Sequence, residues 1–156
     1  HARHHVFIRD CRSNSFFTGD TFGISYRDFD TAQGAYVFVA SSPSQFDPEK
    51  FKASVRRISD AVPPAVYLTH YAKVQDIGRH ARHLIEQIDD FCEIALAHQG
   101  AGPARADLIR EDLARLILGE LREHGVTLSD AACREVLALD LQLNSDGLVC
   151  WLDSLK

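Results

Sequence analysis

The sequence predicts a mixed α/β fold that continues into a helical extension. Short apolar runs bounded by turn-forming residues, the pattern of β-strands, occupy residues 4–9, 14–18 and 65–69. Apolar residues recur at helical spacing over residues 47–62 and 76–98. After residues 100–104, which combine glycine, alanine and proline, helical spacing alone continues to the end of the chain. We therefore expect an α/β unit over residues 1–99, a linker over 100–104 and a helical extension over 105–156.

The first two strands are predicted to pair in an antiparallel hairpin through the polar turn that precedes Asn14. Residues 21–34 are rich in turn-forming residues but also carry Phe22, Tyr26 and Phe29. These rings either line a pocket wall or anchor the loop on the core. Residues 35–40 fit a strand and also fit part of a helix.

Helix boundaries are marked by residues with known capping roles. Asp47 and Pro48 are typical of an N-cap and the first helical position. The apolar face of this helix comprises Phe51, Val55 and Ile58, and that of the next comprises Ile77, Leu84, Ile88, Phe91, Cys92 and Ala95. In the extension, Gly125 is expected to end a helix over 105–124, and Ser129 to open another that reaches about residue 140. Residues 144–147 would then cap a last short helix, or alternatively form a hairpin turn.

Composition excludes several classes of function. The chain has 156 residues, of which 46% are hydrophobic and 25% charged, enough for one globular core. A net charge of -5 without a basic cluster argues against nucleic-acid binding. No apolar run approaches the ~18 residues of a membrane span, and no signal peptide is evident. We expect no membrane partner.

The four cysteines form no Cys-x-x-Cys pair, so reduced thiols in a cytoplasmic protein are expected rather than a zinc cluster. The sequence begins with histidine and contains no methionine. We therefore expect a processed or partial chain.

Potential metal ligands lie at the ends of three apolar strands: His1, Asp20 and His70. Two imidazoles and a carboxylate suit zinc and similar divalent ions. Each residue also has an ordinary structural interpretation. A terminal His1 would fray, Asp20 would cap a turn, and His70 would bond to backbone.

The segments His1-Ala-Arg-His-His5, Thr18-Gly19-Asp20-Thr21 and Leu68-Thr69-His70 resemble, in this order, three motifs of the metallo-β-lactamase superfamily. The resemblance covers roughly residues 1–98. It implies that the chain supplies the C-terminal half of an αββα sandwich, followed by the helical tail. The main signature of the family, His-x-His-x-Asp-His, is absent.

The resemblance implies that the parent protein is a hydrolase in which water attacks an ester, thioester, amide or phosphoester of a small molecule. Two divalent metal ions would be the cofactors, zinc first, with iron or manganese as alternatives. Asp20 matches the bridging carboxylate, His1 and His70 match ligands, and Tyr71 would donate a hydrogen bond to substrate. The tail would cover the active-site side or form a dimer interface.

A second hypothesis treats the chain as a non-catalytic αβ domain that acts by association. It would pair with a missing upstream half of the same protein or form a homodimer. Four further histidines are expected to be structural or exposed. His5 would support the sheet, and His4 would be structural or exposed. His80 and His83, spaced i, i+3, could chelate a metal but are expected to lie on a solvated helix face.

Overall fold

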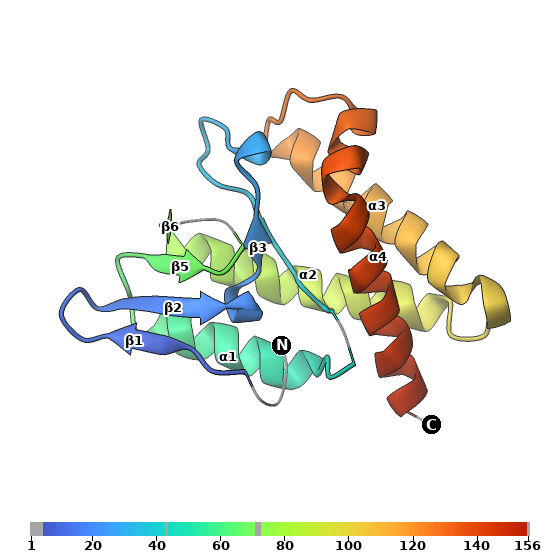
Figure 1. Cartoon of the computed structure of the whole chain (residues 1–156), viewed down its shortest axis with the longest axis horizontal. Coiled ribbons are helices and arrows are strands. Elements are labelled where there is room, and N and C mark those ends of the chain that lie inside the picture. Colours follow the sequence, from blue (N-terminus) through green and yellow to red (C-terminus); the bar gives the residue numbers. More distant parts are fainter. Residues whose placement is uncertain (1–4, 43, 71–72, 156) are drawn as a thin grey trace.

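Residues 5–42, 44–70 and 73–155 are described by a computed structural model, and they form a mixed α/β fold (Figure 1). The strands are β1 (Ile8–Asp10), β2 (Ser15–Gly19), β3 (Ile24–Ser25), β4 (Val37–Phe38), β5 (Val66–Leu68) and β6 (Lys73–Val74). The helices are α1 (Pro48–Asp60), α2 (Ile77–Ala97), α3 (Arg105–Glu123) and α4 (Asp130–Ser154). Short 3-10 turns cover Asp20–Phe22, Arg27–Phe29 and Gly102–Ala104.

The larger sheet has the strand order β1-β2-β5-β6. The predicted hairpin is confirmed, since β1 and β2 pair antiparallel with Ile8 opposite Phe17. β2 and β5 pair parallel, with Phe16 opposite Val66, and β6 returns antiparallel to β5. Adjacent parallel strands end at the same edge of a sheet, so whatever follows Gly19 and Leu68 is brought together.

A second, two-stranded sheet joins β3 to β4, with Ile24 opposite Phe38. Of the two interpretations of residues 35–40, the strand is confirmed at Val37–Phe38. Phe22 and Phe29 are fully buried and anchor the loop on the core, one of the two roles expected for its rings.

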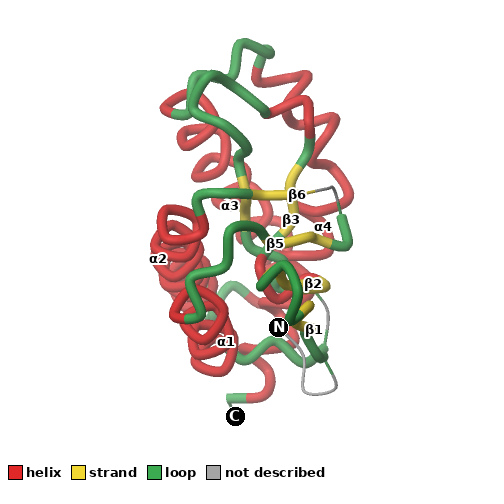
Figure 2. The backbone as a smooth tube through the Cα atoms, turned by 90° about the vertical axis from the view of Figure 1, so that its left-hand side faces the viewer, coloured by secondary structure: helices red, strands yellow, loops and turns green. Residues whose placement is uncertain are grey.

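Helices α1 and α2 cover one face of the larger sheet (Figures 1 and 2). The predicted start of α1 is confirmed, because the Asp47 side chain accepts a hydrogen bond of 3.1 Å from the Lys50 backbone N–H. All three residues expected on the apolar face of α1 are fully buried. On α2, the predicted face is buried except for Cys92, which is half-buried.

The opposite face of the sheet carries a row of apolar and aromatic side chains, of which Ile8 and Phe17 are exposed and Tyr67 is half-buried. Ile8, Phe17 and Tyr67 stand opposite one another across β1, β2 and β5. The rings of Phe17 and Tyr67 stack with their centroids 5.1 Å apart. Ile8 is 64% exposed and Phe17 52% exposed, so no other part of the described chain covers this row.

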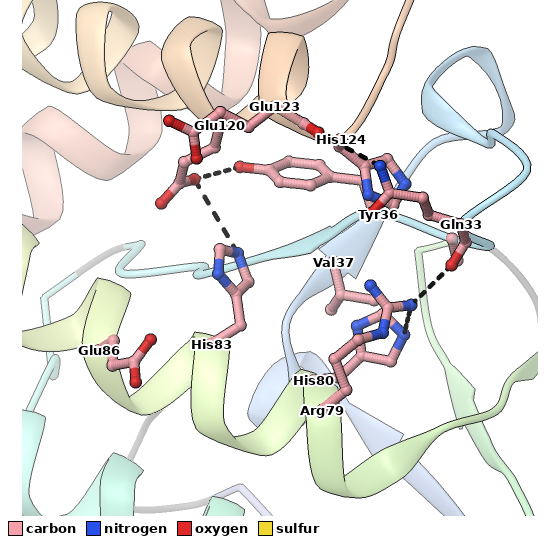
Figure 3. Close-up of a pocket in the computed structure, with 11 residues that line it drawn as sticks. Gln33, Tyr36, Val37, Arg79, His80, His83, Glu86, Glu120, Glu123 and His124 are labelled. Atoms are coloured by element: carbon pink, nitrogen blue, oxygen red, sulfur yellow. Dashed lines mark hydrogen bonds and ion pairs between the residues drawn. The ribbon is translucent and has the colours of Figure 1, made fainter.

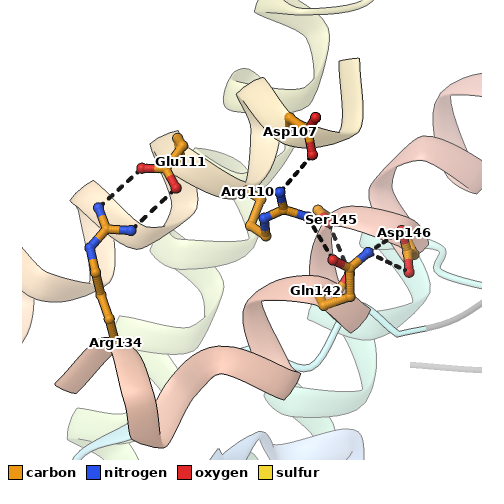
Figure 4. A network of polar contacts seen from close by, with 7 residues as sticks. All are labelled: Asp107, Arg110, Glu111, Arg134, Gln142, Ser145 and Asp146. Atoms are coloured by element: carbon orange, nitrogen blue, oxygen red, sulfur yellow. Dashed lines mark hydrogen bonds and ion pairs between the residues drawn. The ribbon is translucent and has the colours of Figure 1, made fainter. Parts of the chain in front are cut away.

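Helices α3 and α4 pack against each other and against α2, and their buried side chains join the same hydrophobic core as the sheet. Gly125, with a φ of 84°, follows α3, and Ser129 caps α4, as predicted. Polar contacts on the surface also connect the two helices (Figure 4). Arg134 forms two hydrogen bonds with Glu111, and Arg110 bonds to Gln142 at 2.6 Å.

The prediction of a break at residues 144–147 is wrong, because α4 is continuous through them. The reason is tertiary. The Asn144 side chain accepts a hydrogen bond of 2.7 Å from the Ser41 N–H and donates one of 3.1 Å to the Val39 carbonyl. Gly147 allows the same approach, because a Cβ there would overlap the Ser41 carbonyl oxygen. Residues 144–147, which resemble a turn in sequence, thus form the contact between α4 and the segment that follows β4.

Across the described residues, no helix is long and apolar enough to cross a membrane. The architecture is mixed α/β as predicted. The more specific expectation, half of an αββα sandwich, stays a prediction.

Candidate functional site

Asp20 and His70 meet at the edge where β2 and β5 end. Asp20 follows Gly19, the last residue of β2, and His70 lies two residues beyond the end of β5. The His70 Nε2 atom is 3.7 Å from Asp20 Oδ1. The side chain of His70 is 61% exposed and that of Asp20 is 25% exposed, and the Asp20 Oδ1 atom itself is buried. The parallel pairing of β2 with β5 is the reason two residues fifty positions apart come together.

The backbone before Asp20 has a conformation that requires glycine. Gly19 has a φ of 54°, a left-handed value that side chains disfavour. A Cβ at this position would also overlap the imidazole ring of His5. The Nε2 atom of that ring lies 3.0 Å from the Thr18 carbonyl oxygen, within hydrogen-bond distance. His5 therefore has the structural role expected of it and holds the turn that presents Asp20.

Helix α4 brings a second carboxylate close to this edge. Tyr26 donates a hydrogen bond of 2.8 Å from its hydroxyl to Asp140 Oδ2. Burial raises the pKa of Asp140, whereas the Tyr26 hydrogen bond and the charge of His70 lower it. Burial and then the Asp140 carboxylate raise the pKa of Tyr26 to about 12. In Figure 1 the arrowheads of β2 and β5 point toward the side on which α4 lies.

Two of the predicted site residues, His1 and Tyr71, lie outside the described residues. The described part of the expected metal site is therefore Asp20 and His70. Within residues 5–42, 44–70 and 73–155, no group of three histidine, cysteine or acidic side chains has the arrangement of a metal site.

The separation of the two candidate ligands fits a shared ion. Two ligand atoms that each lie about 2.0–2.2 Å from one divalent ion can be up to about 4 Å apart. The 3.7 Å between His70 Nε2 and Asp20 Oδ1 is within that limit. An imidazole nitrogen and a carboxylate oxygen are also the donors that zinc, iron and manganese accept.

No protein-family model, curated protein or solved structure matches this chain.

His80 and His83 are not on a solvated face, and that prediction is wrong. His80 is 3% exposed, and its Nε2 atom lies 3.2 Å from Arg79 Nη2. Burial, followed by the charge of Arg79, lowers the pKa of His80 to about 4. His83 is half-buried and lines a cavity with Glu120. The loop before β4 and helix α3 cover this face of α2. The spacing of apolar residues along α2 does not predict either contact, because the partners come from other elements.

The cysteines show no sign of a reactive or metal-binding role. All four thiols are free; Cys133 is buried, Cys92 is half-buried, and Cys11 and Cys150 are exposed. Burial raises the pKa of Cys92 to about 12, which keeps it protonated and unreactive at neutral pH.

Proposed function

We propose that the chain is part of a metal-dependent hydrolase, with Asp20 and His70 as ligands of a divalent metal ion. The observation that supports this most is their 3.7 Å approach at the common edge of two parallel strands. The order of the three motifs and the identity of their residues, with Asp20 inside Thr18-Gly19-Asp20-Thr21, support it independently. Zinc is the first choice of metal, with iron or manganese as alternatives, and a dinuclear site is proposed.

The residues of the chain have distinct tasks in this proposal. A bound divalent ion supplies Lewis acidity and lowers the pKa of water toward neutrality. Asp20 gives the site negative charge and is held in place by the Gly19 turn and the His5 ring. His70 contributes an imidazole nitrogen, and its backbone carbonyl accepts a hydrogen bond of 3.3 Å from the Ser25 N–H. Fixed ligands of this kind save reorganisation during the reaction.

We further propose that α4 forms part of the substrate side of the site. The Tyr26–Asp140 pair lies close enough to His70 for the charges of Asp140 and His70 to interact. A hydroxyl and a carboxylate beside the metal would select among small esters, thioesters, amides or phosphoesters. The assignments of His1 as a further ligand and Tyr71 as a substrate contact also stay predictions, as do the boundaries at 100–104 and the cytoplasmic location.

The test is hydrolysis of p-nitrophenyl esters, an acyl thioester and bis-p-nitrophenyl phosphate, with zinc, iron(II) or manganese(II) added. Asp20→Ala should abolish turnover while the far-UV circular dichroism spectrum is unchanged. Asp28→Ala, which removes an exposed carboxylate eight residues later, should retain turnover and is the matched control. Equal turnover in the two variants would remove the basis for the assignment.

The open sheet face favours a second candidate function, association with a second copy of the chain. Val6, Ile8 and Phe17 are 72%, 64% and 52% exposed on it. Contiguous apolar surface of this kind is typical of protein interfaces. Sedimentation velocity should then show a dimer that Phe17→Ser converts to monomer. A monomer at all accessible concentrations of the unaltered chain would exclude this candidate.

A further inference from the structure

A cavity of about 460 Å³ lies between the start of α2, the end of α3 and the segment that leads into β4 (Figure 3). Its lining includes neither Asp20 nor His70, and also neither Tyr26 nor Asp140. Its volume is in the range of pockets that hold small organic ligands. The side chains that carry the inference are Tyr36, His83, Glu86, Glu120 and Glu123.

The Glu120 carboxylate is held in one orientation by two donors. Tyr36 donates from its hydroxyl to Glu120 Oε2 at 2.5 Å, and Gln87 donates from Nε2 to the same oxygen at 2.6 Å. Gln87 is itself fixed, because its Oε1 atom accepts a hydrogen bond of 2.6 Å from the Val39 N–H. Tyr36 and Gln87 are both buried. Because buried side chains hold it, the Glu120 carboxylate has a fixed position in the cavity, unlike a carboxylate on the surface.

The imidazole of His83 faces this carboxylate with an unsatisfied nitrogen. Its Nε2 atom is buried, has no hydrogen-bond partner in the described chain, and lies 3.9 Å from Glu120 Oε2. The hydrogen bond between the ring and the Val37 backbone occupies the other nitrogen. Burial lowers the pKa of His83, so the ring is neutral at physiological pH and Nε2 is an acceptor. When Glu120 is ionised, above its raised pKa of about 7, two acceptors thus face each other, an arrangement that a donor placed between them would satisfy.

The other charges of the lining favour a cation. Glu86 and Glu123 add two more carboxylates. Arg79 is the one lysine or arginine among the lining residues, and it is already engaged, at 2.9 Å with Asp76 and at 3.1 Å with the Gln33 carbonyl.

We propose that this cavity binds a protonated alkylamine, whose N–H groups donate to Glu120 and to His83 Nε2. An ammonium group carries three donors and a positive charge, so it satisfies both facing acceptors at once. This inference does not depend on the proposed hydrolase function, because the two sites share no residue.

The test is isothermal titration with putrescine at about pH 8, where Glu120 is ionised and the amine is protonated, and at constant ionic strength. 1,4-Butanediol is titrated beside it as a neutral molecule of the same length. Saturable binding of putrescine and none of the diol is expected. Glu120→Gln, which keeps the acceptor oxygen for Tyr36, should weaken binding by about tenfold to a hundredfold, the range for a hydrogen bond to a charged group. Glu111→Gln makes the same change on the outer surface of α3 and should leave affinity unchanged.

His83→Phe provides a second, independent variant. It keeps an aromatic ring but removes the facing acceptor, and it should also weaken putrescine binding. Circular dichroism of each variant checks that the fold is intact. The proposal is overturned if putrescine does not bind saturably, if the diol binds equally well, or if folded Glu120→Gln and Glu111→Gln bind putrescine with equal affinity.

Discussion

Replacing Glu120 by glutamine should make the protein more stable, and increasingly so as the pH rises. Burial raises the pKa of Glu120 from 4.5 to about 7, although the hydrogen bonds from Tyr36 and Gln87 act in the opposite direction. The unfolded chain therefore releases this proton more easily than the folded one. Ionisation of Glu120 thus favours unfolding, and the stability associated with the protonated form is lost as the pH rises from 4.5 through 7.

The magnitude follows from the size of the shift. A difference of about 2.5 pKa units at about 1.4 kcal/mol per unit amounts to about 3 kcal/mol. Relative to the unaltered chain, Glu120→Gln should gain about 3 kcal/mol of unfolding free energy between about pH 4 and about pH 8. The quantity to compare is the difference in unfolding free energy between Glu120→Gln and the unaltered chain, because His80 makes the stability of both proteins depend on pH. Burial lowers the pKa of His80 to about 4, so its contribution to stability is lost as the pH falls.

The assay is urea unfolding at a series of pH values, followed by the fluorescence of Trp151, the single tryptophan of the chain. This residue reports on the core because its ring centroid lies 6.1 Å from that of Phe46. Glu111→Gln is the control, since its exposed pair with Arg134 should be worth less than about 1 kcal/mol. A Glu120→Gln difference that stays constant from about pH 4 to about pH 8 would refute the reasoning.

Three predictions about stability concern α1, α3 and α4, and urea unfolding tests each of them. Gly147→Ala should cost about 1–3 kcal/mol, because the new Cβ overlaps the backbone of Ser41 and Ser42. Gly119→Ala, in open space within α3, should instead stabilise by up to about 1 kcal/mol, and equal effects of the two changes would contradict the close approach at Gly147. Asn144→Ala should cost about 2 kcal/mol or more by leaving buried backbone groups unpaired, and a smaller loss would mean that water replaces the amide. Asp47→Ala should cost about 1 kcal/mol as the α1 cap is lost, and no change would show the cap to be redundant.

Local signals in the sequence predicted much of the fold. The hairpin, the start of α1 at Asp47 and the start of α4 at Ser129 depend on turn and capping residues that act over three or four positions. Such short-range rules are visible in one sequence. The short β4 strand was ambiguous because its apolar run fits a strand and a helix equally well.

The contacts that the sequence did not predict are long-range and polar. Gln87, Asp140 and Asn144 occupy buried positions on otherwise apolar helix faces. That pattern is itself a signal, since a polar residue at a core position needs a partner from another element. The partner cannot be read from spacing, however. The pairing of Tyr26 with Asp140, 114 positions apart, depends on how α4 docks.

For the candidate metal site, the order of the sequence motifs is enough to single out Asp20 and His70 as candidates. Their proximity follows from the parallel pairing of β2 and β5, a tertiary feature. The cavity around Glu120 cannot be predicted from the sequence, because its lining comes from three separate elements and none of them carries a recognisable binding motif.

The most direct test of the metal-site proposal is elemental analysis of the purified chain, with intact mass measured on the same sample. About one or two equivalents of a transition metal per chain are expected, lost in both Asp20→Ala and His70→Ala and retained in Asp28→Ala. Metal that is bound equally by all four proteins, or by none of them, would contradict the assignment of Asp20 and His70 as ligands.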